Sequence, residues 1–239
     1  VFFDTRLRKL VLRPKSIELN KMAFDLKELK VDGLRSTFAT DTSYIAKEAD
    51  TSTTATPFNL TLDKLDLSDV GFAFDDKVDS LHFDILLGSL TGKLRSFDLT
   101  KEEIVVDNLS LDNANTRLII GKEVQRKNAN PAPEANDSQS NWKIFADNLM
   151  LKKVNFLMDN NNMPHTAEGM DYAHLDIQNF SANLENVFYA TDTISGNLKH
   201  LALNERSGLN VEEMRSHFTY TDKGATLKDF YLQTPNTIL

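Results

Sequence analysis

Apolar and polar residues alternate with a period of two along most of this chain. Phe58, Leu60 and Leu62 alternate with polar residues, and the same holds for Trp142 and Ile144. This period is typical of strands that bury one face. Windows with a helical period are scarce, and the best of them, 211–215, is flanked by alternating residues. The sequence therefore predicts an all-β fold of mainly antiparallel strands.

The alternation slips by one residue at equivalent places. Slips follow Leu62 and Leu67 in one segment, and Ala146 and Leu151 in another. A slip of one residue would turn every later side chain to the other face of the sheet. Because apolar residues resume after each slip, we expect β-bulges or short turns that restore the apolar face.

The chain also repeats itself. Residues 58–75 align without a gap on 142–159, with identical residues at pairs such as Asp75 and Asp159, and 26–38 is a weaker copy. Repeats of this kind build elongated, stacked structures. We expect one elongated region over 1–239, with repeat units at 1–39 (partial), 58–121 and 142–239, and with loops or linkers at 40–57 and 122–141.

Composition and motifs exclude several classes of function. Nucleic-acid binding requires clustered basic charge, whereas this chain has a net charge of −8. The absence of cysteine excludes disulfides, thiolate catalysis and Cys-ligated zinc. No nucleophile motif or phosphate-binding loop occurs, and no apolar run is long enough to cross a bilayer. We expect no enzyme activity, no cofactor, no nucleic-acid partner and no transmembrane segment within the chain.

Two charged features have a structural and a functional interpretation. The pattern Asp-x-x-His-x-Asp occurs twice, at Asp79, His82 and Asp84 and at Asp171, His174 and Asp176. It could ligate a metal, but in each copy the histidine and the aspartate after it fit the solvent face of a repeated strand, so we expect no metal site. The basic residues of the first strand could attract anionic headgroups, although a solvated strand face explains them as well. These basic residues are Arg6, Arg8, Lys9, Arg13 and Lys15.

The apolar stripe remains as the candidate site. It could be the filled core of a β-sandwich or solenoid, or the lining of an open groove that holds acyl chains, since both need one apolar face. In the second case its lining is expected to be Leu65, Leu67, Val70, Phe72, Phe74, Leu149, Leu151, Val154, Phe156 and Met158.

Several segments resemble one known family. They are 142–156 with its counterpart from Phe58, 169–177 beginning Gly169-Met170-Asp171, 207–214 beginning Ser207-Gly208-Leu209, and the ending Thr234-Pro235-Asn236-Thr237. These patterns resemble the TamB/AsmA-like superfamily, and the mixture is closest to TamB-like envelope proteins of Bacteroidota. The resemblance spans essentially the whole chain, which reads as an internal fragment of a longer protein.

The resemblance implies a fold, a location and a function. The fold is an elongated, curved sheet with an open apolar groove, called a β-taco. The location is the periplasm, with an inner-membrane anchor formed by an N-terminal helix outside this chain. The implied function is the transfer of phospholipid between inner and outer membrane, with acyl chains as the ligand. The alternative is a scaffold that assembles outer-membrane β-barrel proteins by strand-edge pairing, with a barrel partner bound through regions outside the chain.

Overall fold

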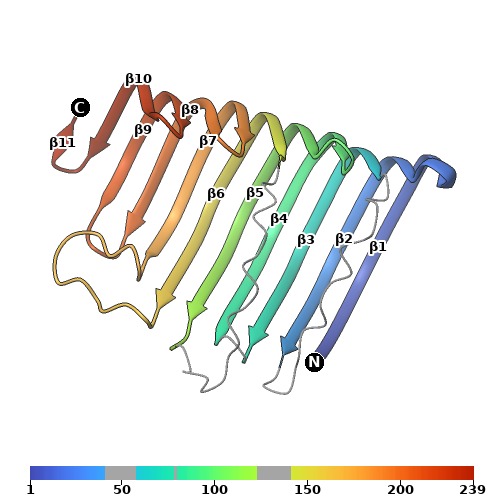
Figure 1. Ribbon diagram of the computed structural model, residues 1–239, viewed down its shortest axis with the longest axis horizontal. Coiled ribbons are helices and arrows are strands. Elements are labelled where there is room, and N and C mark those ends of the chain that lie inside the picture. The colour runs from blue at the N-terminus through green and yellow to red at the C-terminus, as the bar shows by residue number, and fades with distance from the viewer. Residues whose placement is uncertain (41–57, 78–79, 123–140) are drawn as a thin grey trace.

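Figure 1 shows the fold of the protein, a computed structural model that describes residues 1–40, 58–77, 80–122 and 141–239. The loops expected at 40–57 and 122–141 lie almost entirely outside the described residues. The strands are β1 (Phe2–Glu18), β2 (Ala23–Thr40), β3 (Asn59–Asp76), β4 (Leu81–Asp98), β5 (Glu103–Ile120), β6 (Lys143–Asn160), β7 (Asp176–Ala190), β8 (Thr193–Glu205), β9 (Asn210–Thr221), β10 (Gly224–Thr234) and β11 (Thr237–Ile238), with one 3₁₀ turn, η1 (Leu19–Lys21).

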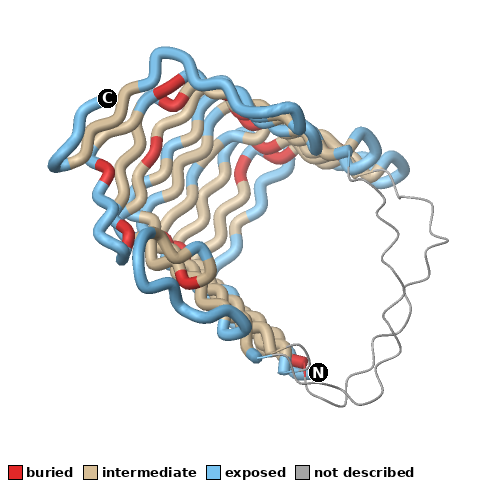
Figure 2. The backbone as a smooth tube through the Cα atoms, turned by 60° about the vertical axis from the view of Figure 1, so that its left-hand side comes forward, coloured by how far each residue is buried: buried red, intermediate tan, exposed pale blue. Residues whose placement is uncertain are grey.

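All eleven strands form a single sheet in which spatial order follows chain order. The all-β prediction is therefore confirmed, and the segment 211–215 is strand, within β9. The strands bend so that their two ends turn toward the same side, which gives the sheet the shape of a trough (Figure 2). Among the described residues, no helix is both long enough and apolar enough to cross a bilayer.

Two of the strand pairings are parallel, which the alternation did not predict. The pairs β2–β3 and β5–β6 run parallel, and the other eight pairings are antiparallel. Alternation has the same period in both kinds of sheet, so it cannot separate them. The two parallel pairs flank 41–57 and 123–140, since a parallel connection must join opposite ends of neighbouring strands. Thr40 pairs with Asp76, whereas Asn59 pairs with Ala23.

The parallel pairing places matching positions of two repeat copies side by side. Leu26 pairs with Leu62, and Phe38 pairs with Phe74, so β2 and β3 contact each other along the alignment found in the sequence. The equivalent residues Phe72 and Phe156 also have similar neighbours, because Phe72 pairs with Ile85 and Phe156 with Ile177.

The slips have two different structural causes. The slip after Leu62 is a register shift between β3 and β4, as expected for a bulge. The slip after Leu67 coincides with Asp69, whose φ is +52°, and the equivalent residue Lys153 has a φ of +51°. No register shift between β3 and β4 occurs there, because the flanking residues Ser68 and Val70 pair with Ser89 and Leu87 in step.

Residues with a positive φ therefore lie side by side on neighbouring strands and form a line across the sheet. Gly33 on β2 and Asn113 on β5 have φ values of +67° and +58° and lie beside Asp69 and Lys153, respectively. On β4 the line passes through Gly88, where an added Cβ would lie 2.8 Å from the carbonyl oxygen of Asn113. Each of these slips places one extra residue between two apolar positions of a strand. Because neighbouring strands have this extra residue at the same level, the apolar face stays continuous on both sides of the line.

We predict that Asn113→Val lowers the free energy of unfolding by about 1–2 kcal/mol, because a β-branched residue is strained at positive φ. The adjacent exposed Asp112→Val should change it by less than about 0.5 kcal/mol, and Asn113→Gly should also be tolerated. Urea unfolding of the three variants measures this difference. Equal losses for both valine variants would contradict a conformational cause.

Candidate functional site

Apolar side chains form continuous rows that cross the strands. Residues paired directly across neighbouring strands lie on the same face of a sheet. One such row, the central row, takes one apolar residue from each of β1 to β10. Its members are Leu10, Val31, Leu67, Leu90, Leu111, Leu151, Ala182, Leu201, Met214 and Leu232. At a strand spacing of about 4.8 Å the central row is roughly 43 Å long.

The ten residues predicted to line a groove fall into five rows on the same side of the sheet. Four of these rows have no polar side chain between β3 and β6, and the row of Phe72 and Phe156 passes through Thr116 on β5. Each residue of β3 shares a row with its repeat equivalent on β6, three strands away, through paired residues of β4 and β5. The pairs are Leu65 with Leu149, Leu67 with Leu151, Val70 with Val154, Phe72 with Phe156, and Phe74 with Met158. We call the side of the sheet that carries these rows the apolar face.

The apolar face has no covering layer among the described residues, which form one sheet only. Of the ten predicted lining residues, Phe72 is exposed and the other nine are half-buried. No large side chain in the described part of the chain has less than 2% of its surface exposed. A filled β-sandwich core would contain several such side chains. The face is thus accessible to a ligand.

Aromatic rings extend the apolar face at one end of the strands. Phe24 and Phe58 have ring centroids 5.4 Å apart, Phe58 and Phe97 6.0 Å apart, and Phe97 and Trp142 5.6 Å apart. The first residues of two repeats, Phe58 and Trp142, therefore both pack on Phe97. At these distances the rings are in contact, so the single tryptophan has a packing role.

The opposite, polar face carries paired charges. The row beside the central row is Lys9, Asp32, Ser68, Ser89, Asp112 and Lys152. The ammonium of Lys30 lies 2.7 Å from the carboxylate of Asp66. Hydrogen bonds from Arg8 and Ser68 lower the pKa of Asp32 to about 2.

The basic side chains of β1 are largely neutralised by neighbouring strands. Arg8 contacts Asp32 at 2.7 Å, Arg13 contacts Glu28 at 3.0 Å, and Lys15 contacts Asp63 at 2.7 Å. Such pairing favours the interpretation of a solvated strand face over that of a headgroup-binding patch.

A hollow of about 650 Å³ lies over β4 to β7, and most of its lining side chains belong to the polar face. Among the described residues that line it, the one basic side chain is Arg117, which donates two hydrogen bonds to Asp84, at 3.1 and 3.2 Å. Because these charges satisfy each other, the hollow offers no unpaired cation to an anionic ligand.

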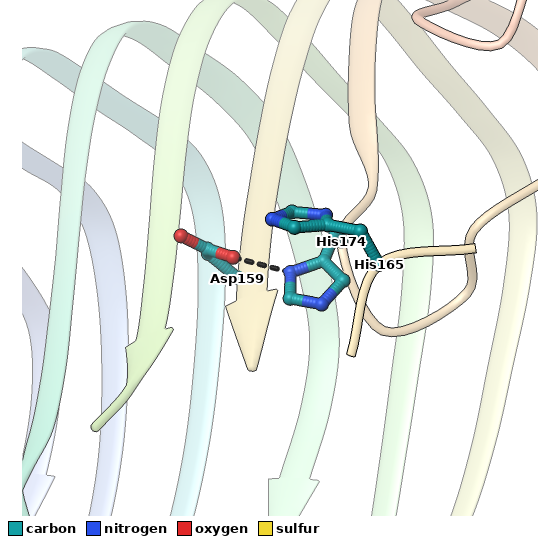
Figure 3. Close-up of side chains that lie close together, drawn as sticks. All are labelled: Asp159, His165 and His174. Carbon is teal, nitrogen blue, oxygen red and sulfur yellow. Dashed lines mark hydrogen bonds and ion pairs between the residues drawn. The ribbon is translucent and has the colours of Figure 1, made fainter. Parts of the chain in front are cut away.

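A cluster of titratable side chains lies where β6 meets the connection 161–175 (Figure 3). His174 is 3% exposed, its Nδ1 lies 2.5 Å from Oδ1 of Asp159, and its Nε2 lies 3.0 Å from the carbonyl oxygen of Met163. The hydrogen bond with Asp159 raises the pKa of His174. The ring of His165 lies beside it, with centroids 3.7 Å apart.

The expectation that His174 lies on a solvent-exposed strand face is therefore wrong. β7 begins only at Asp176, and the residues before it turn back onto the end of β6. Asp171 accepts hydrogen bonds from the backbone N–H groups of Thr166 and Ala173, which closes this turn. In the first copy of the motif, Asp79 lies outside the described residues, and His82 and Asp84 lie on β4.

The sequence analysis missed His165 and Asp159 as members of this cluster. Asp159 precedes His174 by fifteen positions and His165 precedes it by nine, so no short motif connects them. One signal was available: Asp159 is the repeat equivalent of Asp75, and each of these aspartates precedes a motif histidine.

We predict that Leu62→Ala costs more stability than Phe72→Ala, although leucine is the smaller side chain. Leu62 is 3% exposed, and its loss should cost about 2–5 kcal/mol. Phe72 is 38% exposed on the apolar face, so its loss should cost less than about 2 kcal/mol. Urea unfolding measures both variants, and a larger cost for Phe72→Ala would indicate a covered face.

Comparison of the chain with protein-family models, with curated proteins and with solved structures gives no match.

Proposed function

We propose that this chain is a segment of a periplasmic, bridge-like protein of the TamB/AsmA-like kind. In this proposal its apolar face carries phospholipid between the inner and the outer membrane and so supports outer-membrane biogenesis. The observation that carries the proposal is the central row, which remains apolar from β1 to β10 without a covering layer among the described residues.

The length of the central row supports a path rather than a pocket. Half of a bilayer's hydrocarbon core, about 15 Å, corresponds to one extended acyl chain. The central row, at roughly 43 Å, is about three times longer. An acyl chain therefore has several equivalent positions along it, and a ligand with equivalent neighbouring positions can slide.

The chemistry of the face supports the same interpretation. Each buried CH₂ group of an acyl chain contributes about 0.8 kcal/mol, so a chain gains affinity from area alone. The central row contains no charged or hydrogen-bonding side chain that would fix a lipid at one place. Affinity without a fixed polar anchor is what transport along a surface requires.

The test places a photo-crosslinking amino acid on either face of β3. At Phe72 it should capture phospholipid when the purified chain is illuminated with vesicles of phosphatidylethanolamine and phosphatidylglycerol. At the adjacent Ala73, which pairs with Thr37 and Asp84 on the polar face, it should capture none. Equal capture at both positions would contradict the proposal.

One observation favours a second candidate function, a scaffold for outer-membrane barrel strands. β1 has a strand neighbour on one side only among the described residues, and its 17 residues expose large apolar side chains such as Phe3 and Leu10. Such an edge can add a strand of another polypeptide. A crosslinker at Leu10 that captures barrel polypeptide, with no lipid captured at Phe72, would favour the scaffold.

A further inference from the structure

The two main repeats place a histidine beside the same aspartate position. Asp75 and Asp159 are repeat equivalents near the ends of β3 and β6. Nδ1 of His82 lies 3.8 Å from Oδ1 of Asp75, and Nδ1 of His174 lies 2.5 Å from Oδ1 of Asp159. The pair is therefore an element of the repeat, and the two copies can be compared directly.

Of the two copies, the second has the longer connection between its aspartate and its histidine. Four residues, 77–80, connect β3 to β4, whereas fifteen residues, 161–175, connect β6 to β7. The longer connection brings His165 against His174 and the carbonyl group of Met163 against its Nε2. In the first copy, by contrast, Nη2 of Arg117 lies 3.2 Å from Nε2 of His82, which places a positive charge there.

The hydrogen bonds of His174 indicate what its Nδ1 faces. A carbonyl oxygen only accepts hydrogen bonds, so Nε2 carries a hydrogen and donates it to Met163. In the neutral ring, Nδ1 then presents a lone pair to the carboxylate of Asp159. Two acceptors at 2.5 Å attract one another only through a cation between them. That cation can be a proton or, after slight widening of the gap, a metal ion.

We propose that Asp159, His165 and His174 bind one first-row transition-metal ion, with Zn²⁺ as the best fit. Their ligand atoms lie within 4.8 Å of one another. Zinc bonds of about 2.0–2.2 Å place two ligand atoms some 3–4 Å apart. The Asp159–His174 pair must therefore open, and the longest separation must close, each by about 1 Å. The side chains of Asp159 and His165 are 38% and 68% exposed, which gives them room for these shifts. This inference is independent of the proposed lipid transport.

The surroundings of the three ligands match those of metal sites. A histidine ligand usually donates its second ring nitrogen to a carbonyl or carboxylate, which fixes the ring. His174 does so toward Met163, and Nδ1 of His165 lies 3.4 Å from the carboxylate of Asp171. Two imidazoles and one carboxylate favour zinc over Mg²⁺ or Ca²⁺, which prefer oxygen ligands. Three protein ligands leave a fourth position for water.

The test is titration of the EDTA-treated, dialysed chain with ZnCl₂, followed by isothermal calorimetry. We expect one Zn²⁺ per chain, no comparable heat with MgCl₂ or CaCl₂, and a blue, tetrahedral d–d spectrum with Co²⁺. His165→Asn and Asp159→Asn should each weaken Zn²⁺ binding by more than about tenfold, since even an outer partner of a ligand contributes that much.

The matched control is His82→Asn, which removes the equivalent histidine of the first copy and should leave Zn²⁺ affinity unchanged. His165→Asn should leave the unfolding midpoint of the metal-free chain unchanged, because the removed side chain is exposed. Absence of Zn²⁺ binding by the native chain would overturn the proposal. Equal weakening by His82→Asn and His165→Asn would overturn it as well, since it would indicate non-specific binding.

Discussion

Pairing between neighbouring strands holds the described sheet together, because among the described residues no second layer packs against it. The described strands from β2 to β6 are each 18 residues long and are paired with both neighbours over nearly their whole length. Burial contributes a smaller share than in a two-layer fold, since few apolar residues of the described part are fully removed from water. Backbone hydrogen bonds therefore contribute a larger share of the stability than in a globular domain.

Such a sheet depends on its register. A shift of one residue between two strands would break every apolar row at that point, since it would turn the following strands over. Charged pairs on the polar face oppose such shifts: Lys30 pairs directly with Asp66, and Arg8 reaches Asp32 on the next strand. Exposed ion pairs contribute at most about 1 kcal/mol each. Their number and placement matter for register more than for total stability.

The sequence predicted which residues share a face of the sheet better than it predicted how neighbouring strands pair. Alternation identified the strands, and the repeat assigned Phe72 and Phe156 to equivalent places. Parallel pairing could not be predicted, because the alternation along β3 is the same whichever way the neighbouring strand runs. The left-handed residue Asp69 was visible only as a slip that a bulge would also explain. The burial of His174 depends on a turn that closes through Asp171, and no periodicity encodes such a contact.

The odd number of strands in the complete repeat has a consequence for directionality. The repeat β3–β4–β5 ends on a strand that points the same way as its first, and β6 then starts in that same direction. Successive repeats are therefore related by translation rather than by a two-fold rotation. Equivalent residues therefore stay at the same end of the strands from one repeat to the next, as Phe58 before β3 and Trp142 before β6 illustrate. In a repeat with an even number of antiparallel strands, the last strand runs opposite to the first. A next copy that began parallel to that last strand would have all its strands reversed, and its two rims would be exchanged. In the transport proposed above, an amphiphile that moves from one repeat to the next would keep its head and tail in a constant orientation.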